Sequence, residues 1–345
     1  MAVRRTPRPR AGRRTARSSR LPRLRAGLPE RAHQVRVLSS ARHPAHLRRP
    51  RSAIGRHVRR VLGQDAEEGG RLSGPDTVFF WTAFILYLAG TVAASLYVGL
   101  RRPGIRRAAF ALTALGFLSN TVALVVRTAA SGHLPITNLF EYLTFFAWAI
   151  VAGFLLLWKR EELRLLTVFA APVAFAMLVV ASLFPSSIEE QLIPALQSYW
   201  LTIHVTLAVL GEAAFAVAFV ASVLYLVASR RESGDETSGG GRLGDPRRFD
   251  EVTYKAIGVG FPLFTIGALF AGAVWAQRAW GRPWSWDPKE TSSLIVWLIY
   301  AIYLHARLVR GWRGRGAAVL SIVGFAMTFF TILGSRILGG LHSYG

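Results

Sequence analysis

Eight long apolar runs dominate the chain from residue 78 onward, and short polar segments separate them. Each run comes close to the ~20 residues that an α-helix needs to cross the hydrocarbon core of a bilayer. No segment between the runs is long enough to form a soluble domain. We therefore predict membrane-spanning helices at about residues 78–100, 108–126, 140–158, 165–183, 200–228, 256–277, 291–309 and 317–335.

The segments between the runs alternate in charge, and this alternation predicts the orientation of the helices. Basic loops stay on the cytoplasmic side of a membrane. The basic segments are residues 101–107, 159–164, 230–248 and 307–316. The segments predicted to lie outside are 131–138, 184–200, 280–291 and 339–345. An even number of spans then places both termini outside, so the predicted fold is an all-α membrane protein with both ends external.

Composition supports a membrane protein and excludes several kinds of site. Hydrophobic residues make up 52% of the 345 residues, and the mean hydropathy is positive. Such values are typical of an integral membrane protein rather than of two soluble domains. The chain contains no cysteine, which excludes disulfide bonds, a CxxC redox pair, a zinc–thiolate site and covalent haem attachment to this chain.

The formal charge of +23 is concentrated at the N-terminus. Residues 1–60 contain 19 arginines and a single acidic residue, Glu30, which amounts to +18. We predict a disordered basic extension without a native role, because a basic tail conflicts with an external N-terminus. The alternative is a tail that contacts anionic lipid or ribosomal RNA. An acidic external lead-in (61–77) and the membrane domain (78–345) are predicted to follow, and a chain that starts near Val61 is expected to remain active.

The segment WGRPWSWDPKET gathers three tryptophans, Trp280, Trp284 and Trp286, within seven residues. One interpretation is an aromatic belt, since Trp is enriched where helices leave the bilayer. Belts place one or two rings at a helix end, whereas this cluster suits a flat, apolar, π-rich ligand at the outer surface. Arg282 and Lys289 would then bind anionic groups on the edge of that ligand.

Histidines at predicted outer ends of spans are the second indication of a ligand. His204 lies about one turn into the fifth predicted span, and His342 follows the eighth. Two imidazoles and a tryptophan cluster on one membrane face are the groups that hold a haem, with axial nitrogen ligands on the iron and rings against the porphyrin. The alternative for each histidine alone is a hydrogen-bonded interfacial imidazole. No role is assigned to His133.

Two ionisable residues are predicted within the membrane. His305 is 14 residues beyond Thr291, about 21 Å below the outer surface at the rise of an α-helix. Glu212 is 12 residues beyond Trp200, about 18 Å deep. Ionisable groups at such depth are costly and are functional candidates. Their similar depths suggest that Glu212 orients His305, and the alternative is that Glu212 simply faces a polar interior.

Four motifs together resemble one family. SYWLTIHV, WGRPWSWDPKET, WLIYAIYLHARL and GLHSYG occur here in the order and combination found in the CcsA or ResC-type subunits of System II cytochrome c biogenesis, sometimes called CcsB in actinobacteria. The resemblance covers roughly residues 75–345 and includes the tryptophan-rich WWD segment at 275–291. The external stretch HLPITNLFEYL resembles a weaker signature of the family, with Asn138 and Glu141 at the usual places.

The resemblance implies roles for individual residues. His204 and His342 correspond to the two external histidines that ligate haem iron, and His305 corresponds to the histidine that holds haem iron within the membrane. The core of the haem-binding motif corresponds to Trp280, Trp284, Trp286 and Asp287.

The resemblance also implies a function. Haem b would cross the cytoplasmic membrane to an extracytoplasmic site and be presented to apocytochrome c for thioether formation at CxxCH. This chain would be one subunit of a cytochrome c synthase, with a separate ResB- or CcsB-like membrane subunit. A thiol-reducing pathway would keep the substrate thiols reduced, and no catalytic residue is assigned. Membrane lipid is a further expected partner. Nucleic acid is not expected as a partner. The alternatives are a transporter for another amphiphile and a purely structural subunit.

Overall fold

The computed structural model describes residues 74–157, 164–188, 192–232, 245–338 and 340–341. All of them belong to one compact unit, Val58–Gly345. The basic extension at 1–60, most of the acidic lead-in and His342 lie outside the described residues. The described residues form helices and connecting loops, with no strand among them.

The helices agree with the predicted spans. Among the described residues, seven helices are long and apolar enough to cross a membrane, and a shorter apolar helix covers Leu166–Ala181, so the prediction of about eight spans is confirmed. In chain order the α-helices are α2 (Pro75–Leu100), α3 (Pro103–Ser131), α4 (Leu139–Leu157), α5 (Arg164–Val168), α6 (Ala170–Ala181), α7 (Tyr199–Glu232), α8 (Pro246–Phe264), α9 (Gly272–Trp280), α10 (Pro288–Arg310) and α11 (Arg315–Leu338). A 3₁₀ turn, η2 (Pro194–Gln197), precedes α7, and a π-helical segment, η3 (Thr265–Ala271), joins α8 to α9.

The predicted fourth span is broken into α5 and α6. The break falls at Phe169, three residues before Pro172. A proline has no backbone N–H to donate, and its ring crowds the carbonyl four residues earlier, which here is that of Val168. The helix therefore restarts at Ala170, and α6 is shorter than the other membrane-spanning helices.

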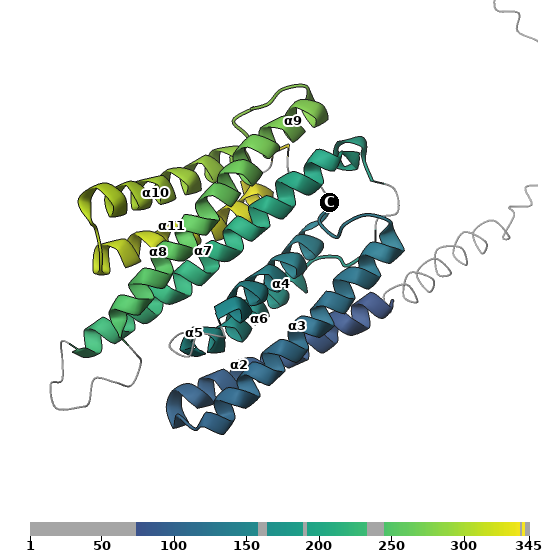
Figure 1. The fold of residues 1–345 in the computed structure, drawn as a ribbon. Helices are drawn as coiled ribbons and strands as arrows, with labels where there is room; N and C mark the ends of the chain where they lie inside the picture. The colour runs from purple at the N-terminus through teal and green to yellow at the C-terminus, as the bar shows by residue number, and fades with distance from the viewer. Residues whose placement is uncertain (1–73, 158–163, 189–191, 233–244, 339, 342–345) are drawn as a thin grey trace, which may run out of the picture. The chain divides into compact units, whose positions relative to one another are not determined.

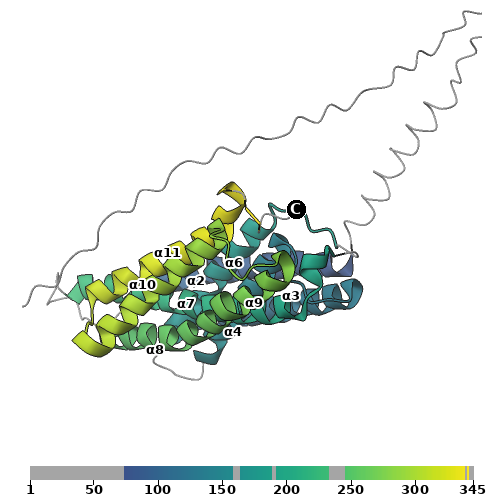
Figure 2. The same cartoon turned by 90° about the horizontal axis from the view of Figure 1, so that it is seen from above.

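Helix α7 is the centre of the bundle. It packs against α4 on one side and against α8 and α11 on the other, while α6 joins α4 to the α2–α3 pair. Figure 1 shows this succession of helices, and α10 and α11 lie side by side in both Figure 1 and Figure 2. Because α7 has neighbours on both sides, it is the most buried of the spans.

Glycines bring α7 into backbone contact with α8 and η3. A Cβ added to Gly211 would lie 2.8 Å from the backbone nitrogen of Phe264, and one added to Gly260 would lie 2.8 Å from the carbonyl oxygen of Gly211. A Cβ on Gly267 would overlap the backbone nitrogen of Ala208. Small residues allow helices in membranes to approach this closely. The contact sets the distance between the start of α7 and η3, where the candidate site lies.

A buried arginine ties together the ends of the first helices. Arg127, near the end of α3, is 3% exposed and forms ion pairs with Glu141 (2.8 Å) and Asp76 (3.0 Å). Its guanidinium also donates to the carbonyls of Ser186 (2.9 Å) and Ser187 (2.8 Å) in the loop after α6. One side chain therefore holds α2, α3, α4 and this loop together.

The HLPITNLFEYL stretch supplies part of this cluster. The side chain of Asn138 accepts the backbone N–H of Glu141 at 2.9 Å, as an N-cap does at the start of a helix. Glu141 in turn accepts hydrogen bonds from the backbone N–H and the hydroxyl of Thr137, both at 2.8 Å. The structure thus gives Asn138 and Glu141 a role in building the start of α4.

Loops predicted to lie on the same side meet at the same end of the bundle. Trp275, in α9, donates to the carbonyl of Ala195 in the 184–200 segment at 2.8 Å, and Leu341 donates to Asp287 at 2.6 Å. At the other end, Arg307 pairs with Asp250 at 2.7 Å. Arg307 begins the predicted cytoplasmic segment 307–316, and Asp250 lies just after the predicted cytoplasmic segment 230–248. Which end faces the outside remains a prediction from loop charge.

Candidate functional site

His204 is held in a fixed orientation near the start of α7. Its Nδ1 lies 2.9 Å from the carbonyl oxygen of Gly267, which accepts the hydrogen bond. Its ring is parallel to that of Trp275, with centroids 5.8 Å apart and planes 5° apart. Trp275 is buried and is itself anchored by the hydrogen bond to Ala195. A backbone hydrogen bond on Nδ1 fixes the tautomer, so any metal ligation by His204 would use Nε2.

The carbonyl that orients His204 comes from the π-helical segment. In η3 the carbonyl of Gly267 also accepts the backbone N–H of Gly272, five residues on, instead of the usual four. Pro262, inside α8, lies three residues before η3 and lacks an N–H for the regular helix ladder. Short π-helical segments inside α-helices are frequent at functional sites. Pro262 is an indication in the sequence of this π-helical segment, which was not among the predicted features.

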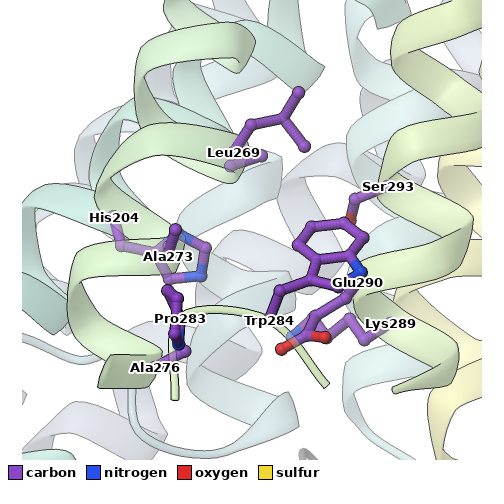
Figure 3. A pocket seen from close by; sticks show the side chains of 11 residues that line it. His204, Leu269, Ala273, Ala276, Pro283, Trp284, Lys289, Glu290 and Ser293 are labelled. Carbon is purple, nitrogen blue, oxygen red and sulfur yellow. The ribbon is translucent and has the colours of Figure 1, made fainter. Parts of the chain in front are cut away.

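A pocket opens beside His204 and encloses about 390 Å³, its open mouth included. Figure 3 shows His204 on one wall and Trp284 with Glu290 on the opposite wall. The lining residues come from α7, η3, α9, the tryptophan segment and α10: His204, Ala268, Leu269, Gly272, Ala273, Ala276, Pro283, Trp284, Lys289, Glu290 and Ser293.

The three tryptophans of the segment occupy different positions. Trp284 lines the pocket, whereas Trp280 packs edge-on against Trp275 with centroids 4.7 Å apart. Trp286 is 69% exposed and stands perpendicular to Trp284, with centroids 5.6 Å apart. Its φ of +59° is in the left-handed region, which is uncommon for a residue other than glycine. The three rings are therefore a pocket wall (Trp284), a half-buried ring that packs against Trp275 (Trp280) and an exposed ring (Trp286).

Asp287 caps helix α10. One carboxylate oxygen accepts the backbone N–H of Lys289 at 2.9 Å, and the side chain of Glu290 reaches back to the backbone N–H groups of Asp287 (3.3 Å) and Ser285 (2.7 Å). This is a capping box, which satisfies N–H groups that have no partner within the helix. Asp287 is buried and is not among the residues that line the pocket. It accepts hydrogen bonds from backbone N–H groups, a role that the motif did not predict.

The two predicted cations lie in different places. Arg282 is exposed in the loop and is not part of the pocket lining. Lys289 lines the pocket, and its Nζ lies 5.6 Å from the centre of the Tyr142 ring. Tyr142 donates a hydrogen bond to Glu212, which attracts Lys289 electrostatically. Lys289 therefore connects the pocket with a carboxylate buried between α4 and α7.

The suggested pairing of Glu212 with His305 is wrong. Glu212 is 4% exposed and bonds to Tyr142, whereas His305 lies on an exposed face of α10. The two residues have similar predicted depths, but depth does not fix the direction of a side chain around its helix axis. The exposed face of α10 contains Ile295, Leu298, Ile302, His305 and Val309, and its buried face contains Ser292, Val296, Tyr300, Tyr303 and Ala306.

Among the described residues, His204 is the predicted iron ligand that lines the pocket. His305 is on the exposed face of α10, and His342 lies outside the described residues. Leu341, which precedes His342 in the chain, contacts Asp287 at the end of the tryptophan segment. Within the described ranges no three His, Asp or Glu side chains come together to hold a bare metal ion.

Gly272 gives a direct test of the His204 geometry. A Cβ at this position would lie 3.0 Å from both Cε1 and Nδ1 of His204. We expect Gly272→Val to turn the His204 ring away from Trp275 and from the Gly267 carbonyl. If His204 is an iron ligand, the affinity for haem should fall by roughly 10–100-fold, as it does when a metal ligand loses the hydrogen bond that orients it. The measurement is titration of the purified protein with haem. Gly258→Val on α8 is the matched control, because a Cβ there meets nothing within 4 Å. Equal affinities of Gly272→Val and Gly258→Val for haem would contradict the prediction that His204 is an iron ligand.

Comparison with known proteins gives the family. The family model described as "Cytochrome C assembly protein" matches residues 136–342, which include the whole pocket. The chain belongs to this cytochrome c assembly family. The family resemblance inferred from the four motifs is thereby confirmed.

Named members of the family cover most of this chain. "Cytochrome c biogenesis protein CcsA" of Chlamydomonas reinhardtii is 39% identical over 259 residues, which are 73% of this chain and 71% of the relative. The protein of the same name from Microcystis aeruginosa is 36% identical over 319 residues, 78% of this chain and 94% of the relative.

A solved structure shares the fold of this family member. "Cytochrome c Heme Lyase CcmF" superposes with a TM-score of 0.56 at 18% sequence identity. The match covers 78% of this chain but only 49% of the lyase, so the chain spans about half the length of that protein. At this identity the likeness concerns the fold alone.

Proposed function

We propose that this chain acts in cytochrome c maturation as the subunit that carries haem b and presents it to apocytochrome c on the extracytoplasmic side of the cytoplasmic membrane. The family and the names of its relatives support a role in cytochrome c biogenesis. The observation that carries the haem proposal is His204. Its ring lies on the wall of a pocket, with Nδ1 bound to a backbone carbonyl and one face against a buried tryptophan.

The other lining residues suit a haem. In this proposal Nε2 of His204 would ligate the iron, and His342 would supply a second nitrogen ligand. Trp284 provides an apolar ring surface within the pocket, and Ala273 and Ala276 leave room beside it. Lys289 would bind an anionic propionate, since it lines the pocket from the first turn of α10. The chain thus binds and orients the haem, while the thiols come from apocytochrome c.

The exposed face of α10 is the proposed contact with a second membrane subunit. His305 lies there among Ile295, Leu298, Ile302 and Val309, within a helix apolar enough to span a membrane. An imidazole in contact with lipid tails is costly, so another protein surface is expected to cover it. A ResB-like subunit that supplies a second iron ligand fits this position, and haem passing along this face would reach the external pocket afterwards.

An absorption spectrum tests the proposal against its alternatives. The chain, purified together with its ResB-like partner from cells that make haem, is expected to show a Soret band. His305→Ala is expected to empty both sites, whereas His204→Ala should leave haem at the inner site with an altered spectrum. Absence of a Soret band in the intact complex would favour the structural subunit, and a different bound chromophore or lipid would favour the transporter.

A further inference from the structure

The carboxylate of Asp287 joins two segments that are 54 residues apart. One oxygen accepts the backbone N–H of Lys289 at 2.9 Å and caps α10. The other accepts the backbone N–H of Leu341, beyond the end of α11, at 2.6 Å. The side chain is 6% exposed, so water competes little for either hydrogen bond. Hydrogen bonds to a carboxylate are among the stronger ones in proteins.

Gly340 shows that this contact is built closely. Its φ is +137°, a conformation that side chains other than hydrogen rarely permit. A Cβ at this position would overlap the carboxylate of Asp287 and lie 3.0 Å from Cδ of Pro288. The backbone of the C-terminal segment therefore approaches the start of α10 at a distance that only glycine allows.

A helix cap alone does not require this arrangement. Capping needs one acceptor oxygen, and serine or asparagine provides it as well as aspartate does. Aspartate differs because it offers two acceptor oxygens and no donor. Both oxygens are used here, one for the helix and one for the C-terminal segment.

We propose that Asp287 is a positioning residue that clips the C-terminal segment, at Gly340 and Leu341, to the start of α10 before haem arrives. The consequence for ligation by His342 rests on the proposed function. A site that is ordered in advance binds its ligand more tightly, because less conformational freedom is lost on binding. The clip itself concerns Asp287, Gly340 and Leu341 and can be tested without haem.

Two substitutions separate the clip from the cap. Asp287→Asn keeps an acceptor for the cap of α10, but its amide group has only one acceptor oxygen for two N–H groups. Leu341→Pro removes the N–H that Asp287 accepts and leaves the cap unchanged. Leu341→Ala is the matched control, since it shortens the side chain and keeps the N–H donor.

The position of the tail is read with a spin label. Because the chain has no cysteine, Ser343→Cys provides a single site for a nitroxide, and its electron paramagnetic resonance spectrum is recorded on the haem-free protein in lipid vesicles. We expect the broad spectrum of an immobilised label in the parent and in Leu341→Ala. The immobilised component should be lost in both Asp287→Asn and Leu341→Pro. A label that is mobile in the parent, or immobilised in all variants, would overturn the proposal, as would a loss in Asp287→Asn alone.

Haem binding gives a second, separate measurement. In the haem-loaded complex, Asp287→Asn and Leu341→Pro are expected to change the axial-ligand signature of the external haem, while the His204 ligand is retained. If the complex holds no haem at all, the proposed function fails, but the spin-label result still decides the clip. If the spin label shows the clip and the haem signature is unchanged in both variants, the clip does not act on ligation.

Discussion

His204→Ala is expected to reduce holocytochrome c formation to the background level while the protein still inserts in the membrane. The His204 ring is held by the Gly267 carbonyl and by Trp275 at the wall of the pocket. The substitution removes the proposed iron ligand and leaves the close backbone contacts between α7 and η3 in place. The measurement is haem staining of secreted c-type cytochromes, normalised to the amount of the membrane protein. Added imidazole is expected to restore part of the activity by replacing the lost nitrogen ligand.

His133→Ala is the matched control for this experiment. His133 lies in the loop before α4, and its Nδ1 is 3.0 Å from the carbonyl oxygen of the adjacent Leu134. It is not among the residues that line the pocket, so we expect normal maturation. Normal cytochrome c formation in His204→Ala, or an equal loss in His133→Ala, would contradict the assignment of the site to His204.

Arg127→Ala is expected to destabilise the protein by about 3–5 kcal/mol, the cost of removing one partner from a buried ion pair. The substitution leaves Glu141 and Asp76 without their cation and frees the carbonyls of the loop after α6. The measurement is thermal unfolding in detergent together with the yield of folded protein. Glu141→Gln added to Arg127→Ala should recover part of the loss, because it removes one buried negative charge.

Lys255→Ala provides the comparison on the surface. Lys255 pairs with Glu251 at 2.6 Å, but the two side chains are 63% and 59% exposed. An exposed pair of this spacing contributes only about 0.3–0.5 kcal/mol. We expect nearly unchanged unfolding of Lys255→Ala. Similar losses in Arg127→Ala and Lys255→Ala would show that the buried cluster does not hold the helix ends together.

The sequence predicted the spans well because length and apolar composition suffice for them. It also predicted which loops share an end, since charge alternates along the chain. It did not predict the break before Pro172 or the π-helical segment after Pro262, although a proline marks both places. Proline shows where a helix ladder is interrupted, but tertiary packing decides whether the helix breaks or widens.

The site was predicted in part. His204, Trp284 and Lys289 lie on one pocket because their motifs are close to the same helix ends, which the loop pattern already indicated. Depth alone did not give the direction of His305, because direction depends on which face of α10 is buried. Arg127 was missed because the second span was predicted to end just before it, although an ionisable residue so close to an apolar run is itself an indication.

The role of Asp287 could not be read from the motif either. The order of Trp284, Trp286 and Asp287 suggests three groups around one ligand. The φ of Trp286 and the cap formed by Asp287 show that the end of this segment also turns the chain into α10. Residues that are adjacent in sequence thus divide between the pocket wall and the support behind it.

The most direct test of the account is the structure of the chain with its partner subunit and bound haem, determined by electron cryo-microscopy. The account predicts haem in the pocket between His204 and Trp284, with Nε2 of His204 bonded to the iron and Nδ1 still hydrogen-bonded to Gly267. Haem bound elsewhere in the complex, with this pocket filled by side chains or lipid and His204 away from the iron, would contradict it.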